Sequence, residues 1–238
     1  MMFSLVKYNI SYYIKSAKYL APVLLYIAFL AINYQASPIG IWSNLHITII
    51  AIFIFANFVA VSFINSEDKT QRYIAMLHVK NETVYHLSKI LSLVVFLLPF
   101  YVVTVLLPII LGSFSRSIRI SEIIIYLAVY FLIGFLGIVV GVFFNSDLFS
   151  TEMAVLAHIV ITTIFVVPFN VIYENNVFIV FAYYLLPPVN FLAERLHRIG
   201  DGTFYIDLNF GLFVANAVIY VLVLTVLYNA AMRRFNKR

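Results

Sequence analysis

Residues 19–66 read YLAPVLLYIAFLAINYQASPIGIWSNLHITIIAIFIFANFVAVSFINS and contain no Asp, Glu, Lys or Arg. A membrane-spanning helix needs about 20 apolar residues, because it crosses a hydrocarbon layer in which an isolated charge is costly. This window is long enough for two such helices. The turn-forming run ASPIG at Ala36–Gly40 divides it, so the stretch predicts two spans joined by a short connection.

The composition of the whole chain agrees with a membrane protein. Of its 238 residues, 64% are hydrophobic and 11% are charged, with a mean hydropathy of +1.03. A soluble domain of this length could not bury so much apolar surface. The chain has no cysteine, which excludes disulfides, thiolate metal sites and cysteine nucleophiles. Its net charge of +5 is not gathered into a solvated basic patch, so nucleic-acid binding is not expected.

Further charge-free windows predict four more spans. They are Ile90–Ser115, Ile123–Ser146, Met153–Tyr173 and Leu208–Met232. The apolar window 175–193 is not counted, because Pro187 and Pro188 end any helix there after about ten residues. We therefore expect residues 174–207 to form an external re-entrant segment. The predicted fold is all-α: one polytopic domain of six spans over residues 1–238.

The distribution of cations predicts the orientation of these spans. With six spans both termini share one side, and eleven of the 15 Lys and Arg residues then lie on that side. The other four, Arg116, Arg119, Arg195 and Arg198, lie opposite. Because cytoplasmic loops carry the excess of Lys and Arg, both termini are predicted to be cytoplasmic in a bacterial cell membrane.

The segment before the first span reads as a helix that lies in the membrane surface. Apolar residues recur at Phe3, Val6, Ile10 and Ile14, at the spacing of one helix face, while lysines fall largely on the other face. No small-residue cleavage site follows a short apolar core, so residues 1–18 are expected to be retained as an interfacial helix. The alternative is a longer first span, which would place those lysines at membrane depth.

Residues 66–89 form the one sizeable cytoplasmic loop, within the stretch NSEDKTQRYIAMLHVKNETVYHLSKIL at Asn65–Leu91. Tyr73, Met76 and Leu77 supply apolar side chains among many charged ones. A short helix of this kind can dock into a groove on another protein. A solvated loop whose charges only fix the topology is equally compatible with this composition.

The layout of this loop resembles the permease subunits of ABC-2-type transporters. In these, a span ends in a Phe followed by a Glu, a short leucine-rich helix and a turn come next, and a Lys precedes the following span. This chain has Phe63, Glu67, Ile74, Met76, Leu77, Lys80-Asn81 and Lys89 in that order. It departs from the family at Gln71, where Gly is usual, and at Lys80, where Pro often begins the turn.

The resemblance implies that the loop is a coupling helix seated in a cleft of a separate ATPase subunit. The contacting residues would be Glu67, Arg72, Tyr73, Met76, Leu77, His78 and Lys89. Two ATPase copies and a second permease copy, identical or homologous, would complete the transporter within the lipid of the membrane. ATP and Mg²⁺ would be bound by the ATPase, because this chain contains no G-x-x-x-x-G-K-[ST] phosphate loop and is expected to bind no cofactor.

Polar residues inside the spans are candidates for a translocation path or lid. They are Asn57, His158, Asn170 and Asn216, with Glu194 and Arg198 in the external segment. Bonding to a neighbouring helix is the favoured interpretation for each residue inside a span. Gly134, Gly137 and Gly141 form a small-residue face in the fourth span, which predicts close helix packing within the monomer or in a dimer. His197 lacks a second histidine at ligand spacing, so no metal site is expected.

The resemblance implies a permease subunit that exports amphipathic or antimicrobial-type peptides, driven by a partner ATPase and not itself an enzyme. Export of drugs or lipids is the alternative. An intramembrane enzyme is less favoured because no nucleophile elbow or paired acids lie at bilayer depth. A channel is less favoured because the spans lack repeated polar positions.

Overall fold

The computed structural model describes residues 2–35, 37–79 and 82–143, together with 214–215, 218–223 and 225–226 near the end of the chain. Helices dominate these residues. They are α1 Met2–Lys15, α2 Leu20–Asn33, α3 Ile41–Ile64, α4 Lys69–Val79, α5 Glu82–Ile110 and α6 Ile120–Phe143. Within the described ranges, extended pairing is confined to an isolated bridge between Ile39 and Phe114. The predicted helical class is confirmed for this part of the chain.

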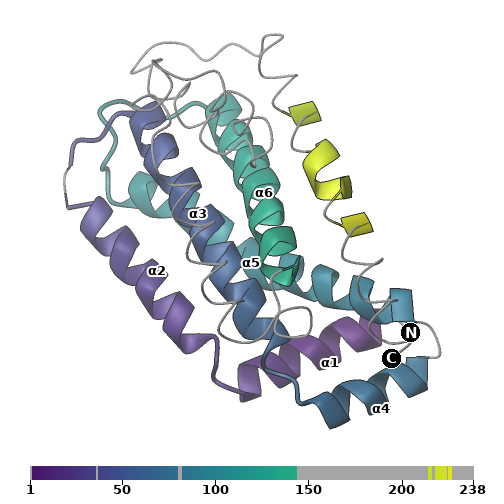
Figure 1. The fold of residues 1–238 in the computed structure, drawn as a ribbon. Coiled ribbons are helices and arrows are strands. Elements are labelled where there is room, and N and C mark those ends of the chain that lie inside the picture. Colours follow the sequence, from purple (N-terminus) through teal and green to yellow (C-terminus); the bar gives the residue numbers. More distant parts are fainter. Residues whose placement is uncertain are drawn as a thin grey trace, which may run out of the picture.

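The helices form a bundle around α3, with α1 and α4 at one end (Figure 1). α3 packs along α6 and also contacts α2 and α5. Among the described residues, three helices are long and apolar enough to cross a membrane: Ile41–Ile64, Thr83–Ile110 and Ile120–Phe143. The bent pair α1 and α2 adds a fourth crossing if the two helices count as one span. Helix α2, the counterpart of the predicted first span, has only 14 residues and is too short to cross alone. The predicted fifth span and the external segment 174–207 lie outside the described residues, as does most of the predicted sixth span.

A sharp elbow separates α1 from α2. The two helices are bent by 79° at the break between Lys15 and Leu20. Ala17 adopts a positive φ of 56° in this turn, a left-handed conformation that ends a helix. The separate N-terminal helix expected from the sequence is therefore present, and it ends three residues before the predicted boundary at residue 18. Its position in the membrane surface stays a prediction.

The connection between α3 and α5 differs in extent from the expected loop 66–89. α4 occupies its middle, and α5 already begins at Glu82, so the last part of the expected loop is helical. The expected third span, Ile90–Ser115, therefore starts earlier and ends at Ile110. Helix α5 continues through Lys89 because the ammonium of that residue is paired with a carboxylate inside the fold, so its charge does not end the apolar segment.

The small-residue face of α6 lies against α3. A Cβ atom on Gly137 would come within 2.7 Å of the Phe53 carbonyl oxygen, and one on Gly141 within 2.6 Å of the Asn57 carbonyl oxygen. Only glycine allows the two backbones to approach so closely. This confirms close packing within the monomer for the G-x-x-x-G pair. Asn57 is fully buried in the same contact between α3 and α6.

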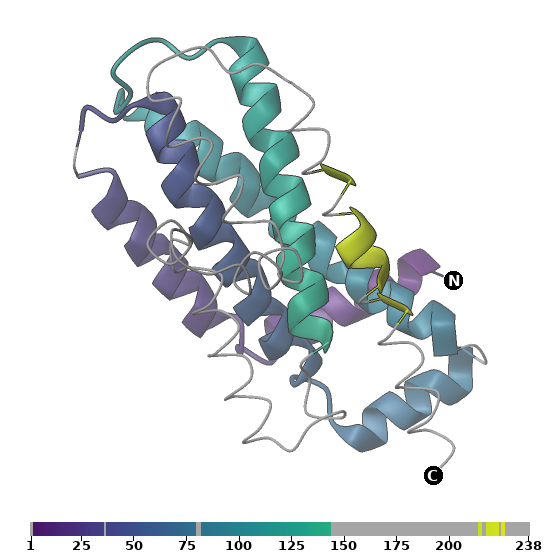
Figure 2. The ribbon, with the colours of Figure 1, turned by 45° about the horizontal axis from the view of Figure 1, so that its top comes forward.

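The α2–α3 and α5–α6 connections are joined at the end of the bundle opposite α4 (Figure 2). Ile39 donates to the Ser113 carbonyl at 2.8 Å and accepts from the Ser115 amide at 3.0 Å. The carboxylate of Glu122 lies beside them, at the start of α6. It accepts from the Arg116 guanidinium at 2.6 Å and from the Arg119 backbone amide at 2.8 Å.

Candidate functional site

Helix α4 exposes an apolar face at the end of the bundle where α1 lies. Tyr73 is 64% exposed, Ile74 58% and Leu77 61%. These side chains recur at three- and four-residue spacing, so they share one side of the helix. An exposed cluster of this kind outside the apolar spans is typical of a surface that binds another protein. His78 is also exposed.

A buried ion pair lies between the residues that precede α4 and the start of α5. Glu67 precedes the helix and Lys89 lies in the second turn of α5, yet their side chains are only 5% and 7% exposed. The ammonium nitrogen lies 2.6 Å from the carboxylate oxygen. The hydroxyl of Tyr85 donates to the same carboxylate, and the ammonium also lies 4.9 Å from the centre of the Tyr85 ring. The pair therefore ties the end of α3 to the start of α5 across α4.

Arg72 and Met76 lie on the inner side of α4 and are half-buried. The guanidinium of Arg72 is near enough to the Tyr85 hydroxyl to act on it electrostatically. Val79, at the end of the helix, is buried where α4 meets α5. The inner face therefore fixes α4 to the bundle, while the outer face remains on the surface.

Helix α1 packs beside this site through α5. The amide nitrogen of Asn9 donates to the hydroxyls of Ser88 and Ser92 at 3.2 and 3.4 Å. Tyr13 is fully buried against the rings of Phe63 and Phe96, at centroid distances of 4.9 and 5.3 Å. These contacts join α1 to both α3 and α5, so α1 is part of the same structural unit as α4.

A groove of about 550 Å³ runs between α1 and α4. Its walls include Leu5 and Tyr8 from α1, and Ile74 and His78 from α4. Burial, together with the negative charge of Glu67, raises the pKa of the Tyr8 hydroxyl, so this hydroxyl stays protonated at neutral pH. The groove is therefore lined by apolar side chains together with a neutral phenol hydroxyl and an imidazole.

The structure divides the seven predicted coupling residues into three groups. Tyr73, Leu77 and His78 are exposed on α4, Arg72 and Met76 face inward, and Glu67 and Lys89 are buried in their ion pair. A partner can reach the first group directly. The ion pair instead holds α4 in place, so its two residues do not offer their charges to a partner in this structure.

Two residues at this site were not among the predicted coupling residues. Ile74 is exposed beside Tyr73, and its three-residue spacing to Leu77 was a sufficient signal. Tyr85 holds the Glu67 carboxylate, and no local pattern indicated that contact.

Of the candidate path and lid residues, only Asn57 is described, and it lies in the α3–α6 contact. The others lie outside the described residues: His158, Asn170, Asn216, Glu194 and Arg198. In the described part of the chain, no three His, Asp or Glu side chains come close enough together to hold a metal ion.

Polar groups inside the described helices bond to one another across the bundle. Tyr26 and Thr104 share a hydrogen bond of 2.7 Å between α2 and α5, and Thr48 and Tyr130 share one of 2.6 Å between α3 and α6. The Tyr126 hydroxyl donates to the Ile41 carbonyl. Such bonds fix one helix against another where water is scarce.

Cations are unevenly distributed between the two ends of the described bundle. The end that carries α1 and α4 includes Lys7, Lys15, Lys18, Arg72 and Lys89. The other end includes Arg116 and Arg119. This asymmetry follows the pattern that orients membrane proteins.

Comparisons of the chain with protein-family models, with curated proteins and with solved structures gave no match.

Proposed function

We propose that this chain is the permease subunit of an ATP-driven exporter of the ABC-2 type, and that α4 is the helix through which a separate ATPase subunit acts on it. The observation that carries the proposal is the exposed apolar face of α4, formed by Tyr73, Ile74 and Leu77. Large apolar side chains exposed on a short helix gain free energy when a partner protein covers them and removes them from water.

The attachment of α4 supports a role in transmitting force. α4 meets α3 and α5 at its two ends, and the Glu67–Lys89 ion pair joins those same ends. A partner that pushes on α4 therefore moves two long apolar helices together. A helix joined to the bundle only by flexible loops would not transmit such a movement to the long helices. Binding of a nucleotide-closed ATPase to one arrangement of α4 in preference to another would shift the permease between two states.

The charge distribution supports a cytoplasmic location for α4, where ATP is present. The end of the bundle with α1 and α4 carries most of the described cations, and such ends face the cytoplasm. We infer a bacterial cytoplasmic membrane, two ATPase copies and a second permease copy from the resemblance of the loop around Glu67 and Lys89 to the family.

The hydrogen bonds inside the bundle favour a transporter over a channel. A channel of fixed structure needs polar groups that face a water-filled path. Several described buried hydroxyls bond between helices instead, as Tyr26 does with Thr104 and Thr48 does with Tyr130. We infer an amphipathic peptide as the cargo, and a drug or lipid as the alternative, from the resemblance to compact six-span exporters.

Co-purification tests the proposed partner. An affinity-tagged chain, extracted from the cells that encode it, should retain a protein with a phosphate-binding loop and should hydrolyse Mg-ATP. Replacing Tyr73 and Leu77 with Asp should remove both the partner and the activity. Ile120→Asp is the matched control, because Ile120 is 78% exposed at the opposite end of the bundle. Retention of the ATPase by the double α4 variant would contradict the proposal.

Site-directed labelling tests the orientation independently. The chain has no cysteine, so a single introduced thiol reports its own position. Thr70→Cys on α4 should react with a membrane-impermeant maleimide only after the cells are opened. Ser117→Cys, in the α5–α6 connection, should react in intact cells. The reverse pattern would place α4 where no ATPase can reach it.

A further inference from the structure

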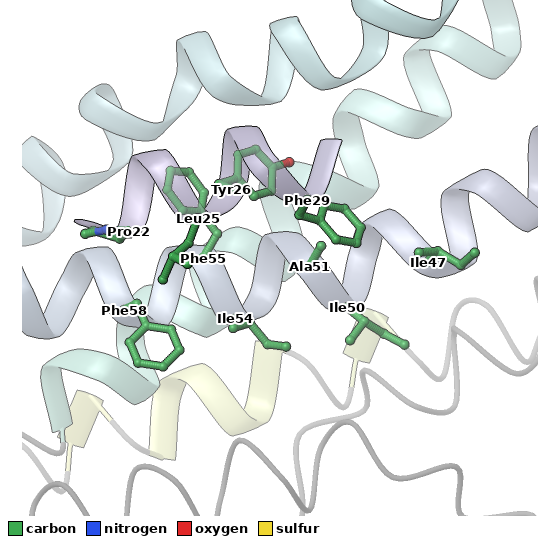
Figure 3. Close-up of a pocket in the computed structure, with 10 residues that line it drawn as sticks. All are labelled: Pro22, Leu25, Tyr26, Phe29, Ile47, Ile50, Ala51, Ile54, Phe55 and Phe58. Atoms are coloured by element: carbon green, nitrogen blue, oxygen red, sulfur yellow. The ribbon is translucent and has the colours of Figure 1, made fainter. Parts of the chain in front are cut away.

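We propose that a groove between α2 and α3 binds one acyl chain of an anionic glycerophospholipid, with the lipid phosphate beside the ammonium of Lys18. The groove has a volume of about 300 Å³ (Figure 3). This inference does not depend on the proposed transport function, because it holds on whichever side of the membrane α1 lies.

The surface of the groove is chemically suited to a hydrocarbon chain. Its floor is formed by the rings of Tyr26 and Phe55, stacked at 4.2 Å and 10°, and its edges by the exposed side chains of Leu25 and Phe58. The Tyr26 hydroxyl is bonded to Thr104 at 2.7 Å. The other lining side chains, labelled in Figure 3, contain only carbon and hydrogen, so the groove presents carbon atoms. A polar ligand would lose its hydration there without gaining hydrogen bonds.

The length of the groove matches one leaflet. Along α3 it extends from Ile47 to Phe58, which at 1.5 Å per residue is about 16 Å. The hydrocarbon core of a bilayer is about 30 Å thick, so one leaflet contributes about half of that. A single acyl chain that follows α3 therefore spans the groove from end to end.

A cation is fixed at the end of the groove nearest α1. Ser62 lies four residues after Phe58, hence about one turn further along the same face of α3. Its hydroxyl donates to the Lys18 carbonyl at 2.9 Å, and the Lys18 ammonium donates to the Asn65 carbonyl at 2.8 Å. An ammonium has three donors, and a carbonyl does not neutralise its charge. The remaining donors can bind a phosphate at the depth where a headgroup begins.

Quenching by brominated lipid tests this site in the full-length chain. Trp42 is the only tryptophan, so Phe58→Trp in a Trp42→Phe background places one reporter in the groove. In bilayers of mixed composition, dibrominated phosphatidylglycerol should quench it at about fivefold lower mole fraction than dibrominated phosphatidylcholine, the preference that one lysine at the membrane surface provides. Lys18→Gln should remove that preference, whereas Lys7→Gln on α1 should preserve it.

A second tryptophan reporter and a measurement that uses no reporter complete the test. Phe131→Trp on the exposed side of α6 should show no headgroup preference. Native mass spectrometry of the unaltered chain, taken from bilayers with equal amounts of both lipids, should retain phosphatidylglycerol, and Ala51→Phe should abolish this retention by filling the groove. Equal quenching by both lipids would overturn the proposal. So would an unquenched groove reporter, which would mean that a second copy or another segment of this chain covers the groove.

Discussion

Removing one member of the Glu67–Lys89 pair should loosen α4 far more than removing both charges together. The two charged atoms lie 2.6 Å apart, and both side chains are almost completely buried. At an effective dielectric constant of about 20, their attraction is about 6 kcal/mol before desolvation is subtracted. Loss of one partner from a buried pair costs about 3–5 kcal/mol, because the remaining charge is left uncompensated.

The informative variants are Lys89→Met, Glu67→Gln and their combination. Methionine keeps the length of the lysine side chain, and glutamine keeps an oxygen that can accept from the Tyr85 hydroxyl, which donates to Glu67 in the structure. Each single variant leaves one buried charge without its partner. The double variant leaves neither, so it should be close to the unaltered chain in stability.

Amide hydrogen exchange of the chain in lipid nanodiscs measures the effect locally. The relevant segment runs from residue 65 to 89, because it contains α4 and the first turns of α5. A loss of about 3 kcal/mol should accelerate its exchange about a hundredfold. The double variant should stay within about tenfold of the unaltered chain. Arg116→Gln, in the partly exposed ion pair at the opposite end, should leave exchange in this segment unchanged.

Two outcomes would refute this reasoning. Equal acceleration by both single variants and by the double variant would mean that the two charges do not stabilise each other. Unchanged exchange in the single variants would mean that water or other groups solvate the charges, in conflict with the burial of Glu67 and Lys89.

Two further predictions concern helix packing. Gly137→Ala and Gly141→Ala should each lower the stability of the chain in detergent by about 1–3 kcal/mol, because the new Cβ meets backbone carbonyls of α3. The three atoms nearest to a Cβ on Gly134 all belong to the Tyr101 side chain. Tyr101→Leu should therefore restore the stability of the Gly134→Ala variant and should not rescue the other two variants, as measured by thermal unfolding. Asn9→Leu should lower the stability of the chain by about 1 kcal/mol, because it removes the bonds to Ser88 and Ser92. Trypsin should then cleave faster at Lys7. A cleavage rate equal to that of the exposed-site control Ser11→Ala would contradict the role of Asn9 in holding α1 against α5.

The sequence by itself determined the class of this protein and the order of its described helices. Charge-free windows locate long apolar helices because each buried charge has a large cost that depends on the residue alone. The division at Ala36–Gly40 and the separate N-terminal helix follow from such local signals. The composition left the charged segment after α3 open between a helix and a solvated loop, and the resemblance to the ABC-2 family favoured the helix. The small-residue face of α6 was also visible locally, although its partner was not.

Only the tertiary structure decided how the residues of the candidate site are used. Lys89 is inside a helix because Glu67, distant in sequence, compensates its charge. Gly137 and Gly141 of α6 pack on Asn57 of α3 and are therefore engaged within the monomer. On the short helix α4, Tyr73 and Leu77 are exposed whereas Met76 is half-buried, a difference that the sequence did not reveal. The cost of burying a charge, or of omitting a side chain, depends on the atom that faces it, and that atom comes from another part of the chain.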